Sequence, residues 1–179
     1  MRIVKEKYDK LFDLLNNDTL AWARHSGVPF IVCSFDSNAC GSINKVVSDL
    51  QVSLVNYNVR VINIEELIYS VLQREELLEQ AITAEKEDSF DVVESLKNIL
   101  LDGIRNHFLE VLNELGPKGR ILVTRLGGLP VYFRFISLLS YLEGKVEIPV
   151  VFFYPGIQNK NISFMLGEYD DSALRALMV

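Results

Sequence analysis

Residues 36–43, D-S-N-A-C-G-S-I, lie between an apolar run and a helical pattern, where nucleotide-binding α/β proteins carry a phosphate loop. That loop reads G-x-x-x-x-G-K-[ST]; its glycines expose backbone N–H groups to phosphate, and its lysine neutralises the charge. Gly41 is in place, but Asp36 replaces the first glycine and Ser42 replaces the lysine. The stretch is therefore either a degenerate phosphate loop or a simple turn, in which Asp36 or Ser37 caps the helix and Gly41 permits tight packing.

A second candidate site is the turn V-T-R-L-G-G-L-P at residues 123–130. The magnesium-holding strand of an NTPase normally ends in an acidic residue, whereas this apolar run ends in Thr124 and Arg125. Gly127 and Gly128 precede a helical pattern, so their backbone could bind an anion beside Arg125. The same two glycines could equally serve only to allow a tight turn.

No other motif predicts catalysis. His25 and His107 stand apart without metal-ligand spacing, and the sequence contains no H-E-x-x-H, C-x-x-C or G-x-S-x-G. Cys33 and Cys40 are interpreted as two reduced thiols of a cytoplasmic protein. The sequence therefore predicts no metal, no cofactor and no complete catalytic set.

Composition limits the classes of partner. The chain of 179 residues is 49% hydrophobic, which suits one α/β domain spanning residues 1–179. Its net charge of −6 argues against binding nucleic acid or an anionic membrane through bulk charge. The charged, amphipathic beginning does not resemble a signal peptide, and no run reaches the roughly 18 apolar residues of a membrane span.

Strands and helices alternate along the chain. Apolar runs predict strands at residues 29–35, around Val59, Val61 and Ile62, at 119–126 and at 147–156. Helical spacing predicts a lead-in helix at 4–16 and helices at 42–52, from 65 to 82 without a break, at 89–115 and at 129–143, with Pro130 in the first turn of the last. Residues 84–89 predict a loop, and 18–24 a short turn or helix. Residues 161–168 predict a short edge strand, and 172–179 a short helix or strand.

This order predicts an α/β fold with three layers: a mainly parallel, P-loop/Rossmann-like sheet of about four to five strands with helices on both faces. A helical insert separates strands two and three. Ligands of such sheets bind at the carboxyl ends of the strands. The candidate residues there are Asp36, Ser37, Asn38, Glu65, Thr124, Arg125, Gly127, Gly128, Tyr154, Gly156 and Asn159. The aromatic residues in the last third of the chain are predicted to lie in the core, or in part to form an exposed protein-binding surface.

Residues 119–156 resemble the BrxB family of bacterial BREX phage-exclusion systems. In that family a strand ends in threonine and a glycine-containing turn, then an arginine precedes L-L-x-x-L, and the next strand closes in F-Y-P-G. The matching features here are Thr124, Gly127, Arg134, Leu138, Leu139, Leu142 and residues 153–156, which include Tyr154, Pro155 and Gly156. The close likeness covers about the last sixty residues, and the remainder agrees in layout. Arg125 stands where the family commonly has glycine, Pro130 comes one position early, and Ile136 replaces a usual histidine.

The resemblance implies a cytoplasmic defence component that is encoded with a DNA methyltransferase, an ATPase and an alkaline-phosphatase-like protein. It implies no catalytic activity. It implies instead an interaction subunit that binds the alkaline-phosphatase-like partner, the methyltransferase or both, and that meets DNA only indirectly. The alternative from the residues themselves is a nucleotide-binding or NTPase-like enzyme with a degenerate phosphate loop. Sequence-specific DNA binding is disfavoured by the acidic charge.

Overall fold

The computed structural model describes residues 2–17, 23, 28–35, 40–87, 90–127, 134–159, 162–165, 168–169 and 176–179. Its centre is a five-stranded sheet, in which all observed pairings are parallel and the strand order is β2-β3-β4-β1-β8. The strands are β1 (Phe30–Phe35), β2 (Asn58–Asn63), β3 (Gly119–Thr124), β4 (Val150–Pro155) and β8 (Leu177–Met178).

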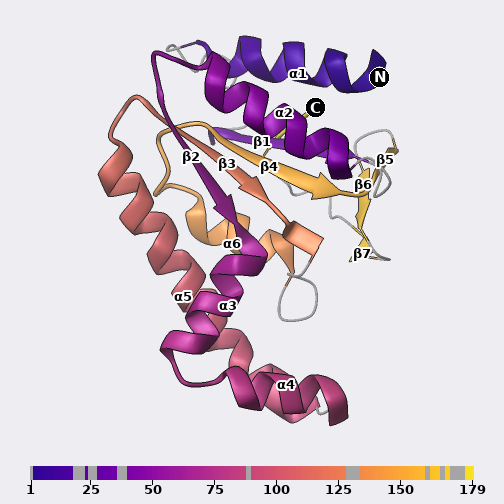
Figure 1. Ribbon diagram of the computed structural model, residues 1–179, viewed down its shortest axis with the longest axis vertical. Coiled ribbons are helices and arrows are strands. Elements are labelled where there is room, and N and C mark those ends of the chain that lie inside the picture. Colours follow the sequence, from indigo (N-terminus) through magenta and orange to yellow (C-terminus); the bar gives the residue numbers. More distant parts are fainter. Residues whose placement is uncertain are drawn as a thin grey trace.

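Helices cover both faces of this sheet, so the predicted three-layer α/β architecture is confirmed (Figure 1). One face carries α1 (Arg2–Leu15) and α2 (Cys40–Ser53), and the other carries α3 (Ile64–Arg74), α5 (Phe90–Leu115) and α6 (Phe135–Leu142). The Rossmann-like detail is not confirmed. β3 and β4 separate β2 from β1 here, whereas a Rossmann sheet places its second strand beside its first.

The middle strands are buried on both faces because each carries apolar side chains in succession. In β1, Ile31 and Cys33 join the core under α1 and α2, while Phe30 and Val32 join the core under α3, α5 and α6. β3 and β4 divide their side chains in the same way. β2 differs, since its exposed and less exposed residues alternate, as expected of a strand at the edge of a sheet.

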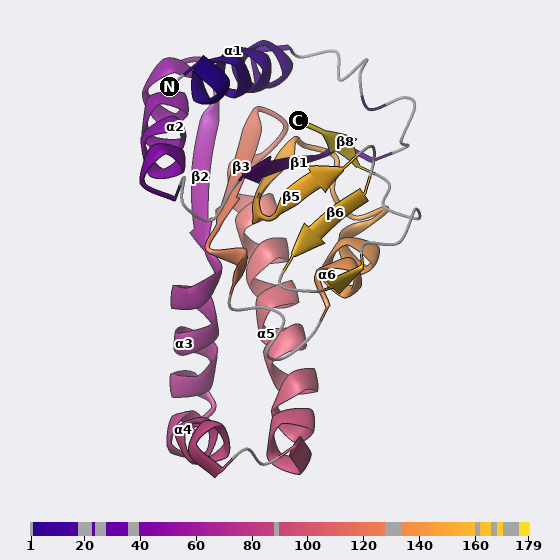
Figure 2. The same ribbon diagram turned by 90° about the vertical axis from the view of Figure 1, so that its right-hand side faces the viewer.

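The predicted helical insert between the second and third strands is present, and it forms an arm that projects from the sheet. α3 and α5 run side by side away from the strands, and α4 (Leu78–Glu87) connects them at the far end (Figure 2). Two details of the prediction were wrong. The stripe expected to continue from 65 to 82 is broken after α3, where Glu76 adopts a left-handed φ of 58°. Residues 84–87, predicted as loop, belong to α4.

The predicted start of the helix after β3 was also wrong. α6 begins at Phe135, and its N-cap Arg134 is extended, with φ −72° and ψ 141°. Pro130 lies outside the described residues. The predicted helix ends after α5 and α6 are confirmed, because Gly116 and Gly144 adopt φ values of 63° and 74°, the left-handed conformation that glycine tolerates at a helix terminus.

The last part of the chain forms an element that the sequence did not predict as such. β5 (Ile157–Asn159), β6 (Ile162–Met165) and β7 (Glu168–Tyr169) make a small antiparallel sheet. The short strand predicted within 161–168 is therefore confirmed as β6, but its predicted place at an edge was wrong, because β6 lies between β5 and β7. The end of the chain is the strand β8, which pairs with β1. The turn or helix predicted at 18–24 lies outside the described residues, apart from Ala23.

Candidate functional site

The carboxyl ends of β3, β4 and β1 lie next to one another, as the sequence analysis expected of candidate site residues. Pro155 pairs with Phe35 in the parallel register of β4 and β1. The amide of Gly156 then donates a hydrogen bond of 2.8 Å to the carbonyl of Phe35. The turn after β4 is thus attached to the last residue of β1, immediately before the stretch that was compared with a phosphate loop.

The first turn is described only from Cys40 onward, so Asp36, Ser37 and Asn38 lie outside the described residues. Gly41 and Ser42 occupy the first turn of α2, and both are exposed. A Cβ atom added at Gly41 would meet nothing within 4 Å, so the prediction that this glycine permits tight packing was wrong. The capping of this turn by Asp36 or Ser37 stays a prediction.

The turn after β3 begins with an unusual backbone conformation. Thr124 donates from Oγ1 to the carbonyl of Ile62 at 3.5 Å, which ties the end of β3 to β2. The exposed Arg125 then adopts φ 59°, a left-handed conformation that costs a non-glycine residue about 1–2 kcal/mol. Glycine adopts this conformation freely.

Gly127 does not mark a close backbone approach. A Cβ atom there would stand 3.9 Å from Cγ of Pro155, an ordinary van der Waals distance. The contact nevertheless places the turn after β3 against the end of β4. Gly128 lies outside the described residues, so the proposed anion site at the double glycine stays a prediction. Arg134 is exposed at the start of α6.

The aromatic residues around β4 belong to the core. The ring of Tyr154 is 5.0 Å from the ring of Phe135, which in turn meets Phe152 at 5.2 Å between centroids. All three side chains are buried. Tyr154 therefore supports the packing of α6 on the sheet. Pro155 and Gly156 are half-buried at the rim of the same turn.

The described residues at this edge supply the Thr124 hydroxyl, two exposed guanidinium groups and backbone amides, which can bind an anion or a peptide. Another predicted member, Glu65, lies in the first turn of α3, where its amide donates to Asn63 Oδ1 at 3.1 Å. Within the described part of the chain, no group of three or more His, Cys, Asp or Glu is placed to hold a metal ion.

The thiol of Cys33 is buried in β1, and burial raises its pKa to about 11 against the lowering effect of Lys7 and Lys10. Such a thiol stays neutral and unreactive at neutral pH.

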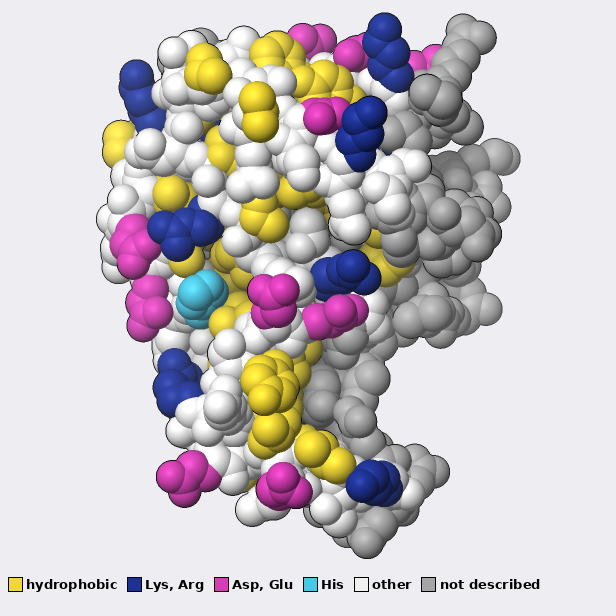
Figure 3. Space-filling model, viewed as in Figure 1, with side chains coloured by type: hydrophobic (Ala, Val, Ile, Leu, Met, Phe, Trp, Pro, Cys, Tyr) yellow, Lys and Arg dark blue, Asp and Glu magenta, His cyan; other side chains and the backbone are white. Residues whose placement is uncertain are grey.

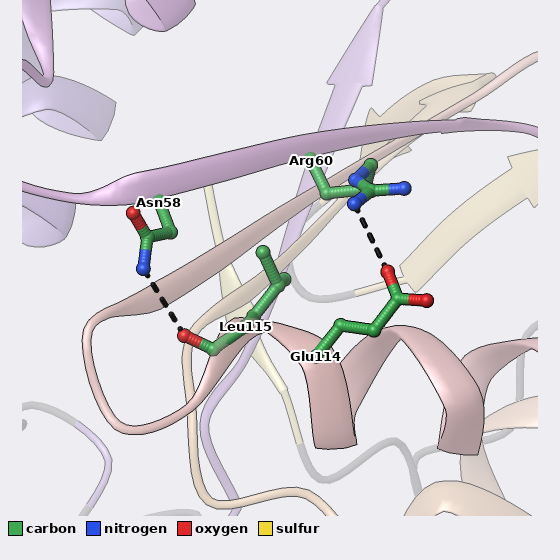
Figure 4. Close-up of polar contacts among 4 residues, drawn as sticks. All are labelled: Asn58, Arg60, Glu114 and Leu115. Carbon is green, nitrogen blue, oxygen red and sulfur yellow. Dashed lines mark hydrogen bonds and ion pairs between the residues drawn. The ribbon is translucent and has the colours of Figure 1, made fainter.

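A groove that the sequence analysis missed lies at the opposite end of the sheet, beside the start of β2. Its volume is about 600 Å³, and it is lined by Gln51, Tyr57, Asn58, Val59, Arg60, Glu114 and Leu115. Arg60 forms an ion pair of 3.1 Å with Glu114, and Asn58 donates from Nδ2 to the carbonyl of Leu115 at 3.2 Å (Figure 4). Both contacts join β2 to the end of α5.

One sequence signal pointed to this groove. The alternation N-V-R-V-I-N sets β2 apart from the uniformly apolar strands, and alternation is typical of a strand with one exposed face or edge. The opposite wall comes from residues more than fifty positions later in the chain, so the groove itself required the tertiary structure.

The fold and these surfaces define a class: an α/β protein with a five-stranded parallel sheet, a projecting helical arm and, among the described residues, no metal-ligand cluster. The family model for "BREX protein BrxB" matches residues 60–179. The chain belongs to the BrxB family and is a component of a BREX phage-defence system. The match also begins some sixty residues before the closely similar segment recognised in the sequence.

Neither a curated protein nor a solved structure matched the chain. No helix in the described parts of the chain is long and apolar enough to cross a membrane.

Proposed function

We propose that the chain is a non-catalytic interaction subunit of its BREX system, which binds the alkaline-phosphatase-like protein, the methyltransferase or both. Membership of the BrxB family supports a role among the products of one defence system. We expect the subunit to act in the cytoplasm and to reach DNA only through its partners, because a net charge of −6 opposes direct binding to phosphates. We expect it to need no cofactor.

The observation that carries this proposal is the apolar surface of the helical arm. Among the residues whose burial is described, each of its three helices has a large apolar side chain in solvent: Tyr69 of α3 is 52% exposed, Ile82 of α4 is 38% exposed and Ile99 of α5 is 40% exposed. On the face drawn in Figure 3, a strip of hydrophobic side chains runs along the arm, with charged side chains of both signs beside it. Exposed apolar side chains on a projecting element are typical of a protein-binding surface.

The exposed residues at the carboxyl ends of the strands are proposed as a further contact surface. They include Ser42, Arg125 and Arg134. The arm and this edge come from different parts of the chain, which would allow one subunit to contact more than one protein.

Co-purification tests the proposal. The chain is produced with the alkaline-phosphatase-like protein and the methyltransferase of its own operon, and binding is measured with purified proteins. We expect binding at micromolar concentration or tighter to at least one of them. Tyr69→Ser should weaken this binding about tenfold, because an exposed aromatic anchor is removed. The neighbouring exposed Ser70→Ala serves as the control. Absence of binding to both partners would refute the proposal.

A further inference from the structure

The outer edge of β2 carries backbone groups that face away from the sheet. The amide of Asn58 donates to the carbonyl of Lys118 at 3.1 Å, so the peptide groups of Asn58 face β3. Successive residues of a strand direct these groups to alternate sides. The N–H and C=O groups of Val59 and Val61 therefore face outward. Among the strands that the structure describes, β2 pairs with β3 alone, so no neighbouring strand pairs with this edge.

The groove beside β2 lies along this same edge. Val59 and Tyr57 pack toward the core under α2, whereas Arg60 interacts with the end of α5 on the opposite face of the sheet. The groove touches residues of both faces. β3 occupies one side of β2, so a groove that borders Asn58, Val59 and Arg60 from both faces can extend along the other side. Its walls are Gln51 and Tyr57 toward α2, and Glu114 and Leu115 toward α5.

β2 lacks the usual protection of an exposed edge. Edge strands are commonly blocked by proline, by a bulge or by a charged side chain across the edge. The six residues of β2 contain no proline, and they pair with β3 in continuous register. Their one charged side chain, Arg60, is held by Glu114 at 3.1 Å against α5. Among the described residues, β2 itself therefore carries nothing that blocks its edge against another backbone.

The two walls of the groove differ in chemistry. Beside the α2 wall, Val52 and Val55 are 76% and 81% exposed; Val52 follows the lining residue Gln51 directly, and Val55 lies two positions before the lining residue Tyr57. The α5 wall carries the exposed Arg60–Glu114 ion pair. An added strand directs successive side chains to opposite faces, so it would meet an apolar surface toward α2 and a charged surface toward α5.

We propose that this groove binds one extended segment of a partner protein, with alternating apolar and polar residues, which joins the sheet as a further strand beside β2. Backbone hydrogen bonds to Val59 and Val61 supply affinity, and the two walls supply selectivity. The inference rests on the proposed function for the existence of a protein partner. A second copy of the chain is the competing occupant, and the experiments below distinguish it.

Two independent sets of variants test the groove against the purified alkaline-phosphatase-like protein and methyltransferase. Val61→Pro removes the outward N–H, and proline is tolerated on an edge strand where that group faces solvent. Val61→Thr is the conservative variant, because it keeps the N–H and the branched shape. Val52→Asp with Val55→Asp changes the apolar wall at exposed positions and leaves the strand intact. We expect Val61→Pro and the double aspartate variant each to weaken binding about tenfold or more, and Val61→Thr to retain it.

Amide hydrogen exchange gives a readout with residue resolution. In the free protein the amides of Val59 and Val61 should exchange quickly, whereas those of Arg60 and Ile62, which face β3, should exchange slowly. In the complex, Val59 and Val61 should slow about tenfold or more while Arg60 and Ile62 stay slow. This alternation distinguishes an added strand from general covering of the surface.

The outcomes separate the two proposals. If the wild-type chain binds neither protein, both the proposed function and this inference are refuted. If the wild-type chain binds, but both sets of variants bind as tightly and Val59 and Val61 still exchange quickly, only the inference is overturned. The inference is also overturned if the free protein is a dimer, with twice the mass of the 20.4 kDa chain, and Val61→Pro makes it monomeric. That result would assign the groove to a second copy of the chain.

Discussion

The contact between α3 and α5 at Gly103 can be tested by the addition of one methyl group. A Cβ atom at Gly103 would stand 2.6 Å from Cγ1 and 2.8 Å from Cγ2 of Val71. Carbon atoms pack best at about 3.5–4.0 Å, so the overlap is close to 1 Å. Rotation of Val71 about χ1 would bring its hydrogen to only one of the two γ-carbon positions, and it would leave the rotamer that valine strongly prefers in a helix. The two helices must therefore separate in Gly103→Ala, which costs about 1–3 kcal/mol.

A helical glycine replaced by alanine also gains about 1 kcal/mol of helix propensity. We therefore expect Gly103→Ala to lower the free energy of unfolding by about 1 kcal/mol net. In the background Val71→Ala, which lacks both γ-carbons, the closest printed contact left is Cβ of residue 71 at 3.3 Å, so the same change should raise it by up to about 1 kcal/mol through helix propensity.

Urea denaturation, followed by far-UV circular dichroism, is measured for the wild type, Gly103→Ala, Val71→Ala and the double variant. The effect of Gly103→Ala on the free energy of unfolding should change sign between the two backgrounds. Val71→Ala itself serves as the reference for the second step, since it removes buried methyl groups without new contacts. Equal effects of Gly103→Ala in the two backgrounds would contradict the packing of α3 against α5 at this point.

Three further predictions concern stability. Arg120→Met should lower the free energy of unfolding by about 2 kcal/mol in urea, because it leaves the buried carbonyl of Leu15 without the 2.8 Å bond from Arg120 Nε. Arg125→Gly should raise it by about 0.5–1 kcal/mol, since glycine relieves the φ of 59° but adds disorder to the unfolded chain; a loss of stability would contradict the strain. The Cys33 thiol has a pKa of about 11 when folded, above its ordinary 9.0, so its neutral form stabilises the fold fully below pH 9, and this contribution is lost as pH rises toward 11. Relative to Cys33→Ala, the wild type should lose about 2 kcal/mol over that range, and parallel pH profiles would contradict the shift.

Much of the secondary structure was predictable because its causes are local. The apolar runs of β1, β3 and β4 are buried on both faces, as their composition indicated. The glycines at 116 and 144 end their helices through their own backbone freedom. The breaks were harder to predict. Glu76 adopts a left-handed conformation that ends the helix within a continuous apolar stripe. Such a break is usually indicated by glycine or asparagine, and neither residue is present at this position.

The candidate site was predictable in part. Because the carboxyl ends of parallel strands share one side of a sheet, the turns after β1, β3 and β4 were expected together, and the contacts of Gly156 with Phe35 and of Gly127 with Pro155 join them. The roles of single residues could not be predicted in the same way. Tyr154 was proposed as a binding residue, but it packs on Phe135 in the core, a contact that depends on where α6 lies.

The amino-acid sequence by itself determined the class of fold, the order of most elements and membership of the BrxB family, because periodicity and short motifs are properties of neighbouring residues. Tertiary structure alone decided the order of the strands, and with it the position of β2 at the edge of the sheet. That position depends on long crossovers and on the packing of helices from distant parts of the chain. The groove between α2, β2 and α5 exists for the same reason, since its two walls are brought together only when both helices pack against the sheet.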